Sequence, residues 1–267
     1  MKKYRREILL IALFALACVL LVLFEYVFTF SQDAATNGLI KETLSRLLVF
    51  AALVPAAVLC GYKRVLSPRV KGRALLWCLP CLFVALANFP FSALITGEAR
   101  VERFELLWLF TLDCIAIGLL EELLFRGILQ PLFLDLLRKK SVTLAVIACS
   151  AAFGAWHFVN LLGGAGIGVT LMQVGYSFLI GAMLSAVYLR TGNIWTGVFL
   201  HAVFDFGGLL VERLGTGAFQ DTVFWVLTAV FGALCFAHVL FYLIKLDKKK
   251  KENAPREEER DSSAGSE

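Results

Sequence analysis

Charge is scarce in this 267-residue chain. Asp, Glu, Lys and Arg together make up 18% of its residues, hydrophobic residues make up 59%, and the mean hydropathy is +0.77. A soluble globular domain carries about 25% charged and about 45–50% apolar residues. The chain therefore has too little polar surface to face water. We expect a polytopic membrane protein with one membrane-embedded domain, and the same composition excludes disordered and collagen-like chains.

A basic surface for nucleic acid is also missing. The net charge is only +5, and the positive residues fall in loops and tails rather than on one face. Proteins that bind nucleic acid concentrate Lys and Arg on a patch or stripe. We therefore expect no nucleic-acid partner.

Apolar stretches long enough to cross a bilayer recur along the chain. A bilayer core needs about 20 mostly apolar residues per helix, and Gly, Pro and charged residues divide the sequence into about eight such stretches. The predicted fold class is therefore all-α, a polytopic membrane bundle of about eight transmembrane helices. The fourth stretch is overlong and contains Pro131, which predicts a tilted or broken helix or a spanning helix joined to an interfacial one. The expected spans are 8–30, 44–62, 74–96, 104–137, 141–162, 168–190, 194–211 and 222–246.

The distribution of Lys and Arg predicts the orientation of these spans. Short cytoplasmic loops are enriched in basic residues. Most of the 26 basic residues lie before the first span and after the second, fourth, sixth and eighth. We therefore expect both termini in the cytoplasm. The apolar run 8–30 is too long for a signal peptide, so it is interpreted as a retained first helix.

The C-terminal end differs in composition from the rest of the chain. Residues 247–267 are rich in Lys, Glu and Ser and hold almost nothing apolar, so they cannot bury enough surface to fold. We expect residues 1–246 to form the transmembrane domain and residues 247–267 to form a disordered, charged cytoplasmic tail. The lysine cluster of this tail serves as a topology anchor or contacts anionic lipid headgroups.

A few ionisable side chains interrupt the apolar spans. An ionisable group at the bilayer centre costs roughly 3 kcal/mol or more, so each one needs a partner or a function. Asp113 and His238 have no companions of this kind in the sequence and are interpreted as structural. The others are too many, on three helices, for helix packing alone, and they are predicted to form a catalytic site. These candidate residues are Glu121, Glu122, Arg126, His157, His201 and Asp205.

The first group of candidates lies in the fourth span. Arg126 follows Glu122 by four residues, which places both on one helix face in the favourable order of acid before base. This spacing predicts an ion pair. Glu121 points about 100° away around the helix and is expected to be the freer carboxylate.

The other candidates lie in the fifth and seventh spans. Phe153 precedes His157 by one helical turn, so its ring is expected to cover the apolar side of the imidazole. His201 and Asp205 are also one turn apart. They are close enough to hydrogen-bond to each other or to converge on one small group.

This residue set favours acid–base chemistry. The sequence places no Ser or Cys beside a His at helical spacing, no calcium-binding loop and no H-E-x-x-H zinc signature. A Glu with a neighbouring His can take a proton from water, while a second His and a polar side chain can hold an oxygen that becomes negative. Amide hydrolysis fits this division of roles.

Three motifs in this order on successive spans resemble the CPBP family. They are E-E-x-x-x-R followed by Gly at 121–127, F-x-x-x-H at 153–157 and H-x-x-x-[ND] at 201–205. The family contains CAAX proteases and bacteriocin-processing or bacteriocin-immunity proteins, and it is also called the Abi family. The run Asn193–Trp195 is similar to the family as well. The resemblance covers a CAAX protease-like core of about 104–210.

The resemblance implies an intramembrane endopeptidase of the CAAX prenyl protease type, with eight helices and an active site inside the membrane. By the motif match, Glu121 would activate water and His157 would assist it. His201 and Asp205 would bind the oxyanion or a metal. Many members carry Asn where this chain has Asp205, and a carboxylate there suits metal binding better than oxyanion binding.

The resemblance also bears on supporting residues and on a cofactor. Glu122 and Arg126 would be the supporting pair. Members are often called metalloproteases, and Glu121, His157 and His201 would suffice as ligands of a divalent metal such as zinc. The sequence leaves the need for a metal open.

Eukaryotic members cut prenylated CAAX proteins, which bacteria generally lack. The short chain and its strongly basic inside loops look bacterial. The expected location is therefore the bacterial plasma membrane, crossed several times. The expected partners are membrane lipid and a substrate that is a peptide or a membrane protein.

Three alternatives stay open at this point. The first is a non-catalytic membrane scaffold or bacteriocin-immunity protein of the same fold. The second is a membrane thiol–disulfide enzyme, because Cys78 and Cys81 have the C-x-x-C spacing that can activate a thiol, although each of the seven cysteines lies in or beside an apolar stretch. The third is a transporter, which the absence of an internal repeat disfavours.

Overall fold

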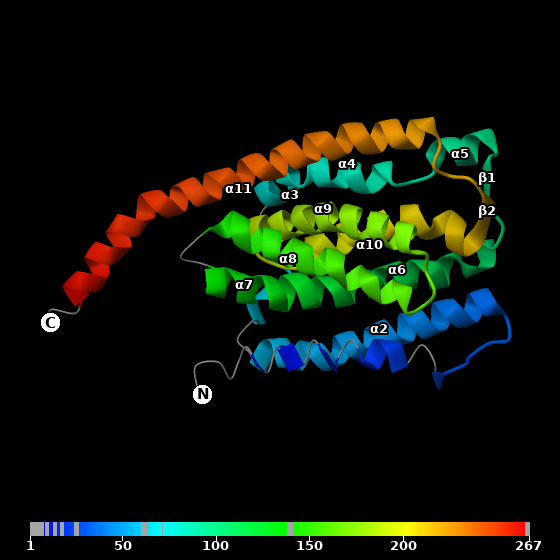
Figure 1. Cartoon of the computed structure of the whole chain (residues 1–267), viewed down its shortest axis with the longest axis horizontal. Helices are drawn as coiled ribbons and strands as arrows, with labels where there is room; N and C mark the ends of the chain where they lie inside the picture. The colour runs from blue at the N-terminus through cyan, green and yellow to red at the C-terminus, as the bar shows by residue number, and fades with distance from the viewer. Residues whose placement is uncertain are drawn as a thin grey trace. The chain divides into compact units, whose positions relative to one another are not determined.

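The computed structural model describes most of the chain (Figure 1). It divides into two compact units, and each is described separately. The first comprises Met1–Leu132 and Val187–Cys235, and the second comprises Phe133–Ala186 and Phe236–Glu267. Parts of the predicted first span, 8–30, lie outside the described residues. The described residues are 8, 11–12, 15–16, 19–23, 27–59, 63–70, 72–137 and 141–264.

The predicted all-α class is confirmed. Helices dominate both units, and the first unit adds one short pair of strands that the sequence did not predict. In chain order the elements that lie in the first unit or begin there are α2 (Ala34–Leu59), η2 (Lys63–Leu66), α3 (Gly72–Trp77), α4 (Leu79–Ala87), α5 (Phe91–Thr96), β1 (Ala99–Val101), η3 (Phe104–Leu106), α6 (Leu107–Glu122), η4 (Leu123–Leu129), α7 (Gln130–Leu137), α10 (Trp195–Leu214), β2 (Gly215–Gly217) and α11 (Thr222–Ala264).

Asp33 fixes the beginning of α2. Arg103 donates to both of its carboxylate oxygens, at 3.2 and 3.1 Å. The carboxylate also accepts the backbone N–H of Thr36 at 2.9 Å, which caps the helix. The hydrogen bonds from Arg103, followed by those from Thr36, hold the pKa of the Asp33 carboxyl well below its usual range. The start of α2 is thereby joined to the loop that precedes α6.

The strand pair joins the end of α10 to the start of α6. β1 and β2 are antiparallel. Just beyond them, the backbone N–H groups of Glu102 and Arg103 both donate to the carbonyl of Leu214, at 2.8 and 3.0 Å. Gly217 has φ +101°, and a Cβ there would overlap the carbonyl oxygen of Glu98. Only glycine suits this position, because it combines a positive φ with a close backbone approach.

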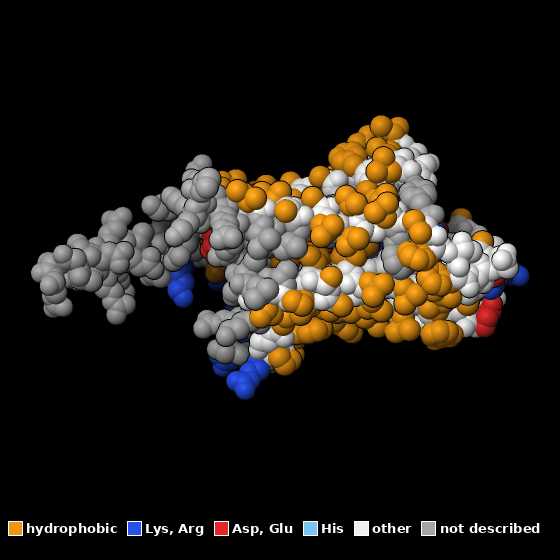
Figure 2. Space-filling view, turned by 90° about the horizontal axis from the view of Figure 1, so that it is seen from below, with side chains coloured by type: hydrophobic (Ala, Val, Ile, Leu, Met, Phe, Trp, Pro, Cys, Tyr) orange, Lys and Arg blue, Asp and Glu red, His pale blue; other side chains and the backbone are white. Residues whose placement is uncertain are grey.

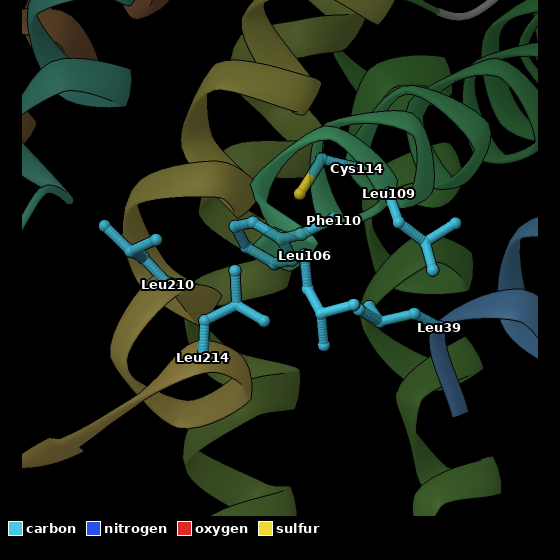
Figure 3. Close-up of a cluster of buried hydrophobic side chains, with 7 residues drawn as sticks. All are labelled: Leu39, Leu106, Leu109, Phe110, Cys114, Leu210 and Leu214. Carbon is cyan, nitrogen blue, oxygen red and sulfur yellow. The ribbon is translucent and has the colours of Figure 1, made fainter. Parts of the chain in front are cut away.

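A cluster of buried hydrophobic side chains packs α2, α6 and α10 together (Figure 3). Phe110 is fully buried, and its ring lies 5.0 Å from that of Phe206 on α10. In a bilayer, close packing of this kind holds helices together, because the lipid is as apolar as the side chains. The cluster consists of Leu39, Leu106, Leu109, Phe110, Cys114, Leu210 and Leu214.

The predicted third span is not one helix. Residues 74–96 fall into the three short helices α3, α4 and α5. Pro80 lies in the first turn of α4 and Pro90 precedes α5. Proline lacks the N–H that a helix interior requires, so each one begins a new helix.

The predicted fourth span, 104–137, is interrupted as its length suggested. α6 passes into the π-helical segment η4, in which the N–H of Gln130 bonds to the carbonyl of Phe125, five residues back. Pro131 follows and has no N–H to offer Gly127, so the regular ladder of the α-helix cannot continue through this point. Insertions of π-helix of this kind occur frequently at functional sites.

The second unit contains α8 (Val142–Trp156), η5 (His157–Leu161), most of α9 (Ile167–Thr191) and the C-terminal part of α11. α8 and α9 approach closely at two glycines. A Cβ on Gly154 would lie 2.8 Å from the carbonyl oxygen of Val174, and one on Gly181 would lie 3.2 Å from Cα of Ser150. Small residues at these points let the helix backbones pack tightly, as expected for membrane helices.

Three of the described helices are long and apolar enough to cross a membrane. They cover Val142–Leu161, Ile167–Thr191 and Thr222–Lys250. Hydrophobic side chains cover much of the face shown in Figure 2, and many are strongly exposed, such as Leu234 at 61%. A water-facing surface would not tolerate so many. The protein is therefore a membrane protein, whereas the predicted count of eight spans and the orientation of the termini stay predictions.

The C-terminal segment differs from the expectation of disorder. α11 extends to Ala264 and so continues through 247–264 as helix. Lys and Glu have good helix propensity, and adding residues to an existing helix avoids the cost of a new nucleus. The carboxylate of Asp247 also accepts from the Ser141 hydroxyl and the Val142 N–H, both at 2.6 Å, and so connects α11 to the start of α8 within the second unit.

Candidate active site

Glu122 and Arg126 form the predicted ion pair. Arg126 Nη1 donates to Glu122 Oε1 at 2.8 Å, and both side chains are fully buried. Glu122 ends α6 and Arg126 lies in η4, so the pair spans the change from α-helix to π-helix. A buried charge needs a partner of opposite sign, and this pair supplies it within one turn of chain.

His201 completes the group around Glu122. Its Nδ1 lies 3.0 Å from Glu122 Oε1, the same oxygen that Arg126 contacts. A carboxylate paired with Arg only accepts hydrogen bonds, so Nδ1 carries the hydrogen in this contact. The side chain of His201 is 5% exposed. Its ring is therefore held in one orientation by a carboxylate that is itself fixed.

The other ring nitrogen of His201 faces two further carboxylates. Its Nε2 lies 3.6 Å from Glu121 Oε2 and 3.5 Å from Asp205 Oδ2. The predicted convergence of His201 and Asp205, one turn apart on α10, is thus present, and Glu121 from α6 joins it. These distances exceed those of good hydrogen bonds. Glu121 is therefore held less tightly than Glu122, as the sequence predicted.

Two glycines that the sequence analysis did not select allow this arrangement. Gly197 precedes His201 by one turn of α10, and a Cβ there would lie 2.6 Å from Glu122 Oε2. Gly118 precedes Glu122 by one turn of α6, and its Cβ would lie 3.0 Å from the carbonyl oxygen of Val198. The absence of side chains brings the two helix backbones together at the level of the acidic groups. The available signal was a glycine one turn before Glu122 and another one turn before His201.

His157 lies in the second unit. It caps the C-terminus of α8 and begins η5. Its ring packs edge-on against Phe153, with centroids 5.5 Å apart and planes at 82°. The predicted aromatic wall is therefore confirmed. The structure brings Glu121, His201 and Asp205 together within the first unit, whereas His157 belongs to the second unit.

The residues do not assemble a metal site in the described part of the chain. Among the described residues, no three His, Cys, Asp or Glu side chains are arranged to hold a metal ion. The predicted ligands Glu121 and His201 approach each other, but a closed or open zinc site needs at least three protein ligands. The metal therefore stays a prediction.

The run Asn193–Trp195 organises the start of α10. The side chain of Asn193 accepts the N–H of Trp195 at 3.1 Å and donates to the carbonyl of Arg69 at 3.2 Å. The indole N–H of Trp195 donates to the carbonyl of Leu66 at 2.8 Å. These contacts attach the end of η2 and the segment after it to the helix that carries His201 and Asp205.

A second ionic cluster was missed by the sequence analysis. Asp113, interpreted there as lacking companions, is fully buried on α6 and accepts from Arg46 Nη1 of α2 at 3.1 Å. Arg46 also bonds to Glu42 at 3.0 Å, and Arg213 of α10 donates twice to Glu42, at 2.8 and 3.1 Å. The interpretation of Asp113 was wrong in its details because its partner lies 67 residues earlier in the chain. Its structural role is supported, since the cluster links α2, α6 and α10.

An apolar cavity of about 210 Å³ lies between α6 and α10. Its lining contains no Asp, Glu, His, Lys or Arg, so the acid–base groups do not open into it. The lining residues are Phe89, Thr111, Cys114, Ile115, Phe199, Ala202, Val203 and Phe206.

These features define a class: a helical membrane protein in which buried carboxylates from one helix meet a His and an Asp from another. Residues 103–207 match the family model described as type II CAAX prenyl endopeptidase Rce1-like. The match confirms the predicted family and includes all six candidate residues. This part of the chain is therefore similar to the CAAX protease (CPBP) family. No curated protein and no solved structure matches it.

The role of Gly197 can be tested by adding one methyl group. We expect Gly197→Ala to push the Glu122 carboxylate away from His201 and to destabilise the protein by about 1–3 kcal/mol, as overpacking in a core does. Gly175→Ala on α9 is the matched control, because a Cβ there meets nothing within 4 Å. Thermal unfolding of the purified protein in detergent measures both, and equal unfolding temperatures would contradict the predicted contact.

The second ionic cluster predicts a strong dependence on Arg46. Arg46→Gln leaves the fully buried Asp113 without its cation, and breaking a buried pair in this way costs about 3–5 kcal/mol. Arg46→Lys should retain most of the stability. Arg213→Gln should cost less, because Glu42 keeps Arg46 as a partner. The free energy of unfolding in detergent distinguishes the three variants, and a loss in Arg46→Gln no larger than in Arg213→Gln would refute the assignment.

Proposed function

We propose that this protein is an intramembrane endopeptidase that hydrolyses a peptide bond in a peptide or membrane-protein substrate by water activated through Glu and His. The family that residues 103–207 match implies a CAAX-type protease. The observation that carries the proposal is the geometry of His201. One nitrogen is fixed by the Glu122–Arg126 pair, while the other faces Glu121 and Asp205.

Glu121 is the base in this mechanism. Its carboxylate is the less constrained of the two adjacent acids, since its Oε2 approaches His201 only to 3.6 Å, whereas Glu122 Oε1 contacts both Arg126 and His201 at 2.8 and 3.0 Å. It can accept a proton from a water molecule as the water oxygen attacks the substrate carbonyl. The same proton then passes from Glu121 to the departing amine, which completes the hydrolysis.

His201 acts on the carbonyl oxygen, and Asp205 supports His201. When substrate binds, a hydrogen on His201 Nε2 can be donated to the oxygen that becomes negative during attack. Groups already fixed in position stabilise such an oxyanion without further rearrangement. Before substrate enters, Asp205 faces the same nitrogen and helps to hold the ring. On the strength of the family motif, we assign His157 an assisting role in the activation of water.

The proposed function also includes a class of substrate and a location in the cell. A site enclosed by apolar helices suits a hydrophobic peptide or a membrane-spanning protein, and the surrounding lipid is the other partner. We place the protein in the bacterial plasma membrane. A divalent metal such as zinc stays a proposal that rests on the family alone.

The proposed catalysis predicts a specific loss in Glu121→Gln. This change keeps the shape of the side chain but removes the base, and general-base catalysis contributes about 10²- to 10⁴-fold to a rate. Glu212→Gln is the control, because Glu212 is an exposed carboxylate on α10. Proteomic comparison of the cleaved membrane peptides in cells that express each form identifies the substrate. The rate is then measured as kcat for a peptide of that sequence with the purified protein in liposomes.

The comparison also separates catalysis from a scaffold or immunity function. Unchanged kcat in Glu121→Gln would reject Glu121 as the base. A folded Glu121→Gln protein that preserves the cellular phenotype of the wild type would show that binding, not hydrolysis, is the function.

We also propose eight membrane spans with both termini in the cytoplasm. The three long apolar helices and the basic loops support this arrangement. It predicts that a cysteine introduced at Ser67 reacts only with a reagent that has access to the cytoplasm, whereas one introduced at Gly164 reacts from outside. Labelling of intact and permeabilised cells on a background without other cysteines tests both positions, and the reverse pattern would overturn the orientation.

A further inference from the structure

The two cysteines that the fold brings together are not the two cysteines of the C-x-x-C motif. Cys78 precedes α4, and its thiol donates to the carbonyl of Ala74 at 3.2 Å. Cys81, one turn later, instead has its sulfur 3.8 Å from that of Cys235 on α11. Both belong to the first unit. Two thiols that are 154 positions apart in the chain therefore meet inside the fold.

The surroundings of this pair shield the two sulfurs from solvent and hold them close to each other. Cys81 is completely buried and Cys235 is 3% exposed. Neighbouring rings fix the two helices side by side, since Phe83 of α4 stacks on Phe231 of α11 with centroids 5.4 Å apart. Leu234, next to Cys235, is 61% exposed on the outer side of α11. The thiols thus lie one layer below a surface that faces lipid.

We propose that Cys81 and Cys235 are a modification site at which a reversible disulfide forms. The oxidant is a two-electron acceptor that dissolves in the membrane, such as a quinone. Two S–H bonds break and one S–S bond forms. The two electrons and two protons reduce the quinone to a quinol. The proposal does not depend on peptide hydrolysis.

The crosslink would act on the helix that supports the candidate site. The side chain of Asn88, at the end of α4, donates to the carbonyl of Phe204 on α10 at 2.8 Å. The ring of Phe89 lies 5.8 Å from that of Phe206. These two contacts lie on either side of Asp205. A disulfide to α11 fixes α4 and, through it, this part of α10.

The test uses 4,4′-dithiodipyridine, a small membrane-permeant disulfide, on the full-length protein in liposomes. One thiol attacks the reagent and releases a thiopyridone, and the second thiol displaces the remaining thiopyridine to close the protein disulfide. We expect mass spectrometry to show peptides of Cys81 and Cys235 crosslinked, with the intact mass lower by two hydrogen atoms per bond. Mixed disulfides on both cysteines, a Cys78–Cys81 bond, or no reaction at either would each overturn the proposal.

Variants make the result specific. Cys235→Ser and Cys81→Ser should each abolish the crosslink, whereas Cys114→Ser, which removes another buried cysteine of the first unit, should retain it. A disulfide that closes so long a loop should raise the unfolding temperature of the oxidised wild type by about 5 °C or more. The same rise in oxidised Cys235→Ser would show that the pair is not its cause.

Discussion

The carboxylate of Glu122 is buried beyond the reach of water, and one of its oxygens accepts from both Arg126 and His201, at 2.8 and 3.0 Å. In an apolar interior an isolated carboxylate is very costly, so these donors cannot leave without destabilising the fold. That constraint holds Arg126 of the π-helical turn against Glu122. It also fixes which nitrogen of His201 is engaged and which is left to face Glu121. The geometry of the candidate site therefore depends on how one buried charge is satisfied.

Satisfying that charge requires the helices to touch. Glu122 comes from α6 and His201 from α10, and their backbones approach at Gly118 and Gly197. Small residues allow such approaches in membranes, where apolar side chains gain little from leaving lipid. The hydrophobic cluster around Phe110 then holds the same two helices further along. Packing and electrostatics thus select the same helix pair.

Much of this was predictable from the sequence, for identifiable reasons. The pair of Glu122 and Arg126 and the pair of His201 and Asp205 are local, one turn apart, so helical geometry alone brings each together. The interruption at Pro131 is local as well. The contact of Asp113 with Arg46 was not predictable, because it joins helices far apart in the chain and no periodicity encodes which helices become neighbours. The prediction of one helix for the third span was wrong for a different reason, because the total apolar length was given more weight than the two prolines within it.

The two ionic clusters on α6 and α10 differ in their balance of charge, and this difference separates structure from chemistry. The first consists of Glu42, Arg46, Asp113 and Arg213, and its two acids match its two bases. Every charge there has a partner, so nothing remains to react. The second consists of Glu121, Glu122, Arg126, His201 and Asp205, in which three carboxylates share one arginine and one histidine. Arg126 pairs with Glu122 at 2.8 Å. Glu121 Oε2 and Asp205 Oδ2 both face the same imidazole nitrogen, at 3.6 and 3.5 Å. This excess of acid around one histidine is the arrangement on which the proposed proton transfer rests.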